Sequence, residues 1–280
     1  KTSPPGSGHN AAASCDTPPD LRPGGRVRSR RKSIANWTPF PKSGKLSRMD
    51  HSPQAIIFDL DGTLLDTLTD LATAANHALT RFGYPTRPVE AYRRFLGSGG
   101  ATLMTRALPP GEAESLGEAG LRPIMEAMRA YYQEHAADAT LPYPGIAELL
   151  ATVRERAIQS GVLSNKPHAA TLAVIRHFFG SHSFAAVQGH VPDMPLKPDP
   201  TSALAMAGTL GLAPSRILYV GDSDVDMFTA RAAGMRAVGA AWGFRGADEL
   251  WASGADHVCA TPLEVAALLP TCPTQPGVVP

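Results

Sequence analysis

The chain contains the stretch Ala55-Ile56-Ile57-Phe58-Asp59-Leu60-Asp61-Gly62-Thr63, in which four apolar residues lead directly into two aspartates. A short apolar run of this kind is typical of a strand buried on both faces of a parallel sheet. Gly62 lets the backbone turn sharply after the strand. Two close carboxylates repel each other, so one can stay ionised as a nucleophile or metal ligand while the other serves as general acid and base. A solvated turn with a helix-capping aspartate is the structural alternative.

Apolar runs and helical periodicities alternate from residue 54 onward. Strands are predicted at 55–58, 158–163, 184–188, 216–220, 237–240 and 257–258, and helices at 68–82, 146–157, 169–179, 201–210, 225–233, 247–252 and 263–269. This alternation predicts an α/β fold with a doubly wound, Rossmann-like parallel sheet. Residues 88–140 are predicted to be entirely helical and to form a small cap inserted after the first strand. Ligands of such sheets bind at the carboxyl ends of the strands, where the unusual polar residues of this chain gather.

A second acidic cluster, Gly221-Asp222-Ser223-Asp224-Val225-Asp226, also follows an apolar run. Three acids in six residues repel one another unless a cation lies among them, and oxygen ligands suit a hard ion such as magnesium. A calcium loop does not fit, because Met227 stands where that loop requires glycine. Helix capping by Ser223 or Asp224 is the structural alternative.

Two further clusters are weaker when taken alone. Ser164-Asn165-Lys166-Pro167 follows a predicted strand, and its hydroxyl and turn N–H groups can hold a phosphate oxygen, although such turns are common. Lys197 stands between prolines in Pro195-Leu196-Lys197-Pro198, which limits its freedom. A lysine held near several acids can neutralise an anionic substrate, whereas most single lysines are solvated surface charges.

Together and in this order, the four clusters resemble the motifs of the haloacid dehalogenase superfamily of phosphatases. That family has D-x-D-G-T, then a strand ending in Ser or Thr, then a lysine, then G-D-x-x-x-D. Here these are Asp59 to Thr63, Ser164, Lys197 and Asp222 with Asp226, spread over residues 54–269. Within the family, the residues of the first three motifs look most like those of the phosphoglycolate phosphatase branch.

The resemblance implies a role for each matched residue. Asp59 is expected to be the nucleophile that forms an aspartyl-phosphate, and Asp61 to protonate the leaving alcohol and then activate water. Mg²⁺ is expected to be held by Asp59, the backbone carbonyl of Asp61 and Asp222, with Asp226 acting through water or as a second layer. Phosphate binding is expected from Leu60, Gly62, Thr63, Ser164, Asn165 and Lys197. Dehalogenases of the family lack the second acid, so Asp61 favours a phosphatase.

The cap is expected to select the substrate, and there the sequence says less. Gly97 and Gly99 resemble the cap loop that faces the active site in this branch, and Arg94 suits a short anionic tail. The expected substrate is a small phosphorylated metabolite, with 2-phosphoglycolate first. The alternatives are a sugar-phosphate phosphatase or a β-phosphoglucomutase-like enzyme, a pyrophosphatase or nucleotidase, and a non-catalytic regulatory protein of the same fold.

The predicted organisation is a disordered basic extension (1–50), a core domain (51–67 and 144–272), a helical cap (68–143) and a flexible tail (273–280). Residues 1–48 carry ten Lys or Arg and two Asp, a charge of +8. This segment is interpreted either as a transit peptide or as an upstream extension before Met49. A third alternative is a nucleic-acid contact through the basic residues 28–32. Residues 49–280 carry sixteen basic and twenty-three acidic residues, a charge of −7, so no nucleic-acid partner is expected. Three scattered cysteines favour a reduced, cytoplasmic compartment, and the lack of a long apolar run means that no membrane partner is expected. The protein is expected to be a monomer or a homodimer.

Overall fold

The structure is a computed structural model that describes residues 52–271. Its main sheet contains β1 (Ala55–Phe58), β4 (Gln159–Pro167), β5 (Ala186–His190), β6 (Ile217–Gly221), β7 (Arg236–Ala240) and β8 (His257–Cys259). These six strands lie in the order β5-β4-β1-β6-β7-β8, and every neighbouring pair is parallel. The predicted doubly wound α/β fold is therefore confirmed. The extension of residues 1–50 and the tail of 273–280 lie outside the described residues.

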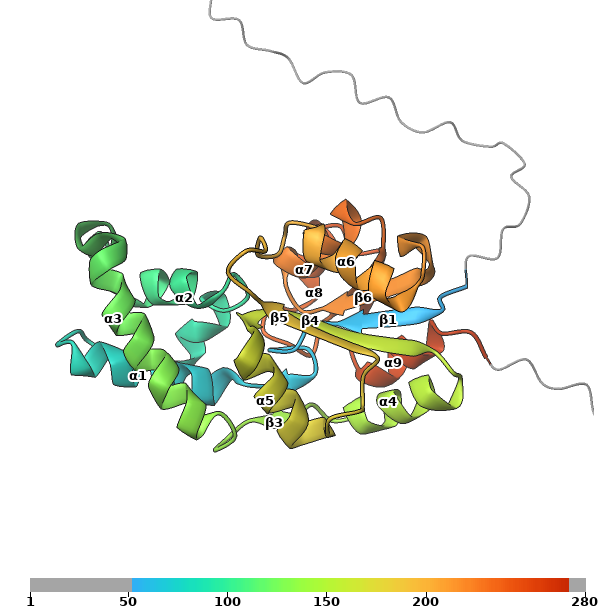
Figure 1. Cartoon of the computed structure of the whole chain (residues 1–280), viewed down its shortest axis with the longest axis horizontal. Coiled ribbons are helices and arrows are strands. Elements are labelled where there is room, and N and C mark those ends of the chain that lie inside the picture. Colours follow the sequence, from blue (N-terminus) through green and yellow to red (C-terminus); the bar gives the residue numbers. More distant parts are fainter. Residues whose placement is uncertain (1–51, 272–280) are drawn as a thin grey trace, which may run out of the picture. The chain divides into compact units, whose positions relative to one another are not determined.

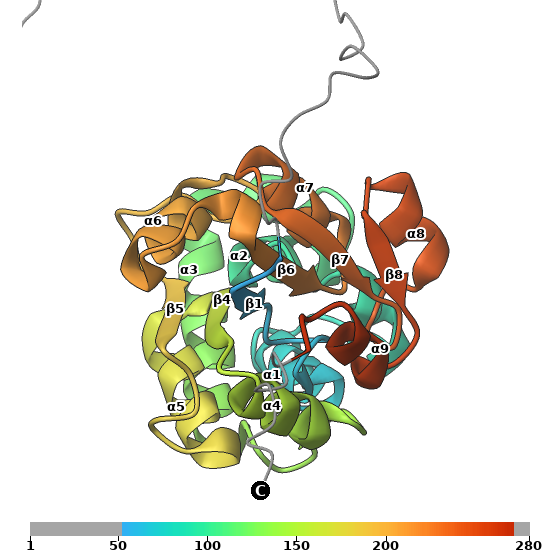
Figure 2. The same cartoon turned by 90° about the vertical axis from the view of Figure 1, so that its right-hand side faces the viewer.

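Helices cover both faces of this sheet (Figures 1 and 2). One face carries α4 (Ile146–Glu155), α5 (His168–Phe179) and α9 (Pro262–Ala267), and the other α6 (Thr201–Leu210), α7 (Asp224–Ala232) and α8 (Ala247–Ala252). In β1, Ile56 and Phe58 belong to the first hydrophobic cluster, and Ala55 and Ile57 to the second. This period of two explains why all four residues are apolar, since each face of the strand is buried.

The predicted cap consists of helices packed around their own hydrophobic cluster. It contains α1 (Leu68–Arg81), the 3₁₀ helix Val89–Arg94, α2 (Gly100–Ala107) and α3 (Glu112–His135). The first helix within the predicted helical stretch 88–140 is thus a 3₁₀ helix rather than an α-helix. α3 has a kink at Gly117, whose φ of 60° takes the backbone out of the helical region, and the sequence analysis did not predict it. The domain bounds at 67–68 and 143–144 stay predictions.

Two very short strands connect the cap to the core. β2 (Leu65–Asp66) and β3 (Leu141–Pro142) pair antiparallel where the chain enters and leaves the cap. Two residues are too few to show a period of two, so the sequence pattern could not predict these two strands. The buried Asp70 carboxylate strengthens this junction by accepting hydrogen bonds from the N–H groups of Ala139 and Thr140 and from the Thr140 hydroxyl.

Most element bounds agree with the predicted ones within about two residues, but β4 is different. It was predicted to end at residue 163, with a turn at 164–167. It instead continues to Pro167, with its register on β5 shifted between Leu163 and Pro167. The third polar cluster is therefore an irregular strand segment rather than a turn. The short 3₁₀ helix Pro214–Arg216 precedes β6. Within residues 52–271, no helix combines the length and the apolar character that crossing a bilayer requires.

Candidate active site

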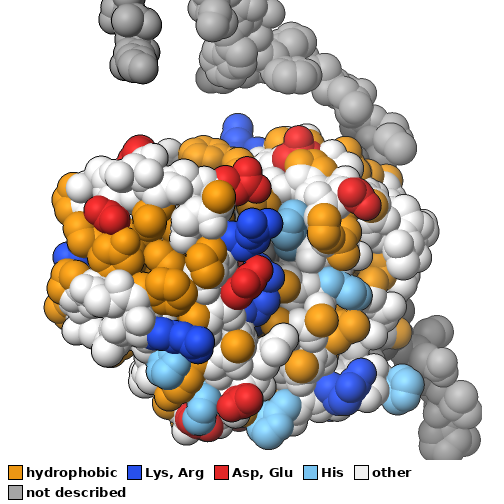
Figure 3. All heavy atoms as spheres, turned by 60° about the vertical axis from the view of Figure 1, so that its left-hand side comes forward, with side chains coloured by type: hydrophobic (Ala, Val, Ile, Leu, Met, Phe, Trp, Pro, Cys, Tyr) orange, Lys and Arg blue, Asp and Glu red, His pale blue; other side chains and the backbone are white. Residues whose placement is uncertain are grey.

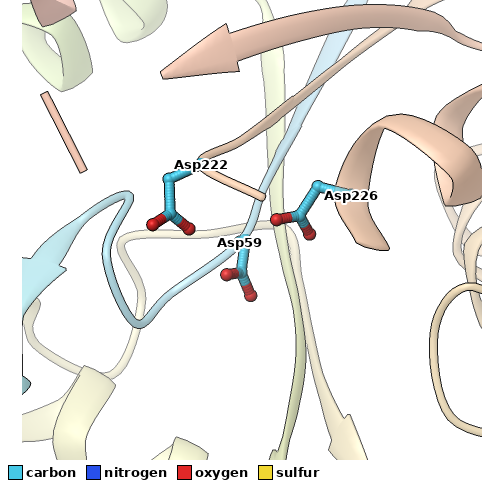
Figure 4. A group of neighbouring side chains, drawn as sticks. All are labelled: Asp59, Asp222 and Asp226. Carbon is cyan, nitrogen blue, oxygen red and sulfur yellow. The ribbon is translucent and has the colours of Figure 1, made fainter. Parts of the chain in front are cut away.

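Three buried carboxylates converge at the carboxyl ends of β1 and β6 (Figure 4). Asp59 follows β1, Asp222 follows β6, and Asp226 lies in the first turn of α7. One oxygen from each lies within 4.8 Å of the others. The parallel sheet explains this meeting, because strands that are neighbours in space bring residues distant in sequence to one edge.

Lys197 is the cation that faces this group. Its ammonium donates hydrogen bonds to Asp59 Oδ1 (2.8 Å) and Asp226 Oδ1 (2.7 Å), and also to the Leu163 carbonyl (3.1 Å). Burial lowers the pKa of Lys197, but Asp226 and Asp59 outweigh that effect and raise the pKa well above its usual value. Lys197 is therefore positively charged, and it pairs with Asp59 and Asp226 but not with Asp222.

Asp59 and Asp222 show the effect of this unbalanced charge. Burial raises the pKa of Asp59 to about 7, against the opposing effect of Lys197. Burial, with the nearby Asp226 and Asp59, raises the pKa of Asp222 well above its usual value. Both carboxylates are thus costly to ionise with only the protein groups around them. A bound cation removes this cost, so the three residues fit a metal site.

Hydrogen bonds divide the three carboxylates into two kinds. Both oxygens of Asp226 are used, one by Lys197 and the other by the Ser223 hydroxyl and N–H in a capping box that begins α7. Asp59 Oδ2 and Asp222 Oδ1 accept no hydrogen bond from the described residues, while Asp222 Oδ2 accepts the Phe244 N–H. Asp59 and Asp222 therefore have the free oxygens for direct ligation, and Asp226 suits a supporting place.

Gly62 is required for this packing, and its predicted phosphate contact stays a prediction. Its φ is +94°, and a Cβ atom there would lie 2.3 Å from Asp222 Oδ2. The loop after β7 closes the same space, since Trp242 donates its ring N–H to the Thr63 carbonyl and Phe244 packs into the cap cluster. The sequence analysis did not identify this loop, because its residues carry no charged motif.

A cavity of about 260 Å³ opens in front of Asp59. Its core wall contains Asp59, Asp61, Ser164, Asn165 and Lys166, and its cap wall includes Leu71, Leu96, Gly97, Gly99, Leu103, Met125, Met128, Arg129, Tyr132 and Gln133. The space-filling view in Figure 3 shows a broad group of hydrophobic side chains beside a mixed group of basic and acidic ones. The cavity thus joins a charged wall to an apolar one.

The predicted site residues fall into three groups with respect to this cavity. Asp59, Asp61, Ser164, Asn165, Gly97 and Gly99 line it, and Lys197, Asp222 and Asp226 lie behind Asp59. The remaining four, Leu60, Gly62, Thr63 and Arg94, do not line it. Leu60 and Thr63 have fully buried side chains, and Arg94 is exposed. A phosphate contact at Leu60 or Thr63 would therefore use the backbone, as expected for Leu60, and this stays a prediction.

Asn165 holds two segments of the cavity wall together, and its predicted help in phosphate binding stays a prediction. Its amide donates to the carbonyls of Gly97 and Lys197, and its carbonyl accepts the Lys197 N–H. Both amide N–H donors are thus used, and they tie the cap loop to the segment that carries Lys197. The Ser164 hydroxyl accepts the Lys166 N–H and still faces the cavity as a donor.

Sequence reasoning missed four residues of this cavity. Lys166 pairs with both oxygens of Asp61, at 2.6 and 2.9 Å, and its ammonium lies 4.6 Å from the ring centre of Tyr132. Arg129 stands exposed on the cap wall, and His190 reaches the cavity from β5. Lys166 stands next to the predicted Ser164 and Asn165, so adjacency alone could have indicated it. The other three come from segments without a motif.

The comparisons with known proteins agree with this geometry. The profile of the family "Haloacid dehalogenase-like hydrolase" matches residues 56–240. A phosphoglycolate phosphatase of Haemophilus influenzae is 34% identical over 190 residues, which is 67% of this chain and 85% of that protein. One of Pseudomonas syringae pv. tomato is 34% identical over 197 residues, or 69% and 71%. The crystal structure of a predicted phosphoglycolate phosphatase from Haemophilus somnus has a TM-score of 0.72 at 28% identity, covering 79% of this chain and 99% of that one.

The chain therefore belongs to the haloacid dehalogenase-like hydrolases, and within that family it is a phosphatase. The relatives to which it is similar carry the name phosphoglycolate phosphatase.

Proposed function

We propose that the protein is a Mg²⁺-dependent phosphomonoester hydrolase that acts through an aspartyl-phosphate on a small phosphorylated metabolite, with 2-phosphoglycolate first. The observation that supports it most is the position of Asp59. This carboxylate lines the cavity, accepts a hydrogen bond from Lys197 and keeps one oxygen free of hydrogen bonds from residues 52–271. The name of the relatives supports the choice of substrate.

The reaction begins with attack of the free Asp59 oxygen on phosphorus. A bond between phosphorus and the Asp59 oxygen forms, and the bond between phosphorus and the leaving oxygen breaks. Ser164 holds a phosphoryl oxygen, and the positive charge of Lys197, which pairs with Asp59, helps to offset the charge that gathers on the phosphoryl group in the transition state. Asp61 gives a proton to the leaving alcohol and then takes one from the water that releases phosphate and restores Asp59.

Asp59, Asp222 and the backbone carbonyl of Asp61 would hold Mg²⁺, with Asp226 supporting them. When bound, the ion offsets the repulsion between the carboxylate and the phosphate. Asp226 serves this site from behind, since it fixes Lys197 on one side and the start of α7 on the other.

The size of the cavity favours a second candidate substrate. A volume of about 260 Å³ exceeds what a two-carbon acid needs, so a sugar phosphate would also fit. The apolar cap wall offers few partners to sugar hydroxyls, and this places sugar phosphates second. Pyrophosphate and nucleotides remain as further alternatives for the same chemistry.

The proposal is tested by phosphate release with and without Mg²⁺ from 2-phosphoglycolate, several sugar phosphates, a nucleoside monophosphate and pyrophosphate. We expect Mg²⁺-dependent release with the highest kcat/KM for 2-phosphoglycolate. A sugar phosphate with the highest kcat/KM would retain the chemistry and replace the substrate. Isomerisation of a sugar phosphate faster than phosphate release would indicate a mutase, and full activity in excess chelator would overturn the metal dependence.

A further inference from the structure

Lys166 is a buried lysine at the cavity whose partner is the proposed acid–base residue. Its side chain is 5% exposed, and its ammonium donates to both oxygens of Asp61. It lies on β4, two residues after Ser164, and therefore belongs to the rigid core wall. The roles proposed above leave this lysine without a task.

The Lys166–Asp61 pair restricts the proposed role of Asp61. A carboxyl that serves the leaving oxygen needs one of its own oxygens within hydrogen-bond distance of it. Lys166 donates to both oxygens of Asp61 and so holds the carboxylate towards itself. Each oxygen can accept a further hydrogen bond, but an oxygen that carries the transferred proton is a poor acceptor for the ammonium. A substrate group that draws the ammonium away from one oxygen therefore frees it for the leaving oxygen.

A charged group of the substrate can do this where a neutral one cannot. An ammonium that exchanges a carboxylate for a hydroxyl in a buried place loses a charge partner, whereas exchange for a second carboxylate keeps one. Tyr132 supplies a second donor at the same place. Its hydroxyl is buried, has no hydrogen-bond partner among the described residues, and belongs to a side chain that lines the cavity beside Lys166.

We propose that Lys166 and Tyr132 form an anion subsite that takes the carboxylate of the substrate's leaving group, and that Lys166 exchanges Asp61 for it when substrate binds. This inference rests on the proposed function. One carboxylate oxygen faces the ammonium and the other faces the phenol, which leaves an Asp61 oxygen free for the leaving oxygen. The subsite joins core to cap, since Lys166 lies on β4 and Tyr132 on α3.

The distances restrict the substrate class. Asp61 lies 2.6 Å from Lys166, and a hydrogen bond at either end adds about 2.8 Å, so the ester oxygen and the carboxylate must lie within about 8 Å of each other. A spacer of one or two carbons lies well within this limit, and longer spacers meet it as well until the two groups lie more than about 8 Å apart. The limit therefore includes phosphate esters of short hydroxy acids among the substrates of this subsite.

The test compares 2-phosphoglycolate with its neutral amide, 2-phosphoglycolamide, which has the same shape and lacks the charge. Wild type is expected to prefer the acid in kcat/KM. Lys166→Met should reduce the acid-to-amide ratio about 10- to 100-fold, the range for a lost hydrogen bond to a charged group. Tyr132→Phe keeps the ring and should reduce the ratio about 3- to 10-fold. Arg176→Met, which removes an exposed positive charge from α5, should leave the ratio unchanged.

Each other outcome has a definite meaning. If Lys166→Met lowers kcat/KM equally for the acid and the amide, Lys166 only positions Asp61, and the proposed anion subsite is wrong. If wild type hydrolyses the amide as well as the acid, or prefers phosphate esters without a carboxylate, the subsite is wrong while the phosphatase stands. If wild type releases phosphate from no ester with Mg²⁺, the proposed function itself fails. Where Lys166→Met does not fold, the ratio measured with Tyr132→Phe decides.

Discussion

The two walls of the cavity are built in different ways. On the core wall, charged side chains follow strand ends, are buried, and are fixed by ion pairs such as Lys197 with Asp59 and Lys166 with Asp61. On the cap wall, apolar side chains of the cap's own hydrophobic cluster face the cavity, and the charged Arg129 is exposed. Chemistry that every substrate shares can be built on the first wall, because each of its groups has one fixed place. On the cap wall, changes of a few side chains are enough to change which substrate the cavity accepts.

The largest effect is expected at the nucleophile of the core wall. Asp59→Asn keeps the size of the side chain but removes the attacking oxygen, so kcat should fall by at least about 10⁴-fold. Phosphate release measures the rate, and circular dichroism should show an unchanged fold. Asp224→Asn is the matched control, since Asp224 lies near the site in sequence but outside the group of three carboxylates, and should retain most of the activity. An Asp59→Asn variant within tenfold of wild type would show that another group attacks.

Lys197→Met should affect both activity and stability. It removes the ammonium that pairs with the buried Asp59 and Asp226, and breaking a buried pair costs about 3 to 5 kcal/mol of unfolding free energy. The rate should fall about 10³-fold because the positive charge beside the attacking carboxylate is lost. Urea unfolding without metal measures the first effect, and added Mg²⁺ should restore part of it because the cation supplies the missing charge. An unchanged unfolding midpoint would mean that the three carboxylates do not depend on Lys197.

The contrast between the walls also explains how far the sequence could be interpreted. Asp59, Ser164 and Asp222 stand in or directly after apolar strands, and the sheet then brings them together, so local pattern and topology suffice. Arg129, Tyr132 and His190 reach the cavity only because α3 and β5 pack where they do. Tyr132 lies in a stripe of apolar residues that has the period of any packed helix. Such residues carry no local signal. The sequence analysis names Arg94 for the cap because it stands near the cap glycines in sequence, and it does not name Arg129.

Metal binding should depend on pH through Asp59. Burial raises its pKa to about 7, above the usual 3.8, so between pH 4 and 7 the folded protein holds a proton here that the unfolded chain has released. Without metal, this group therefore stabilises the fold more as the pH falls through that window. Mg²⁺ needs the ionised form and competes with the proton. The increase in Tm caused by Mg²⁺ should thus be larger at pH 8 than at pH 6, by a few degrees in thermal unfolding. Asp222→Asn should abolish the increase at both values, and an equal increase in wild type at both would contradict the competition.

The smallest effect is expected on the cap wall, where two arginines can be compared directly. Arg129 lines the cavity, whereas Arg94 is exposed away from it, so Arg129→Ala should raise KM for 2-phosphoglycolate about 3- to 10-fold and Arg94→Ala less than about twofold. An exposed charge acts through a field that salt screens, so the effect of Arg129→Ala should shrink in 0.5 M NaCl, unlike that of Lys166→Met. A larger effect at Arg94 would restore the prediction made from the sequence. It would also mean that the cap moves on substrate binding far enough to bring Arg94 to the cavity, and that the cap wall described here is the wall of one state only.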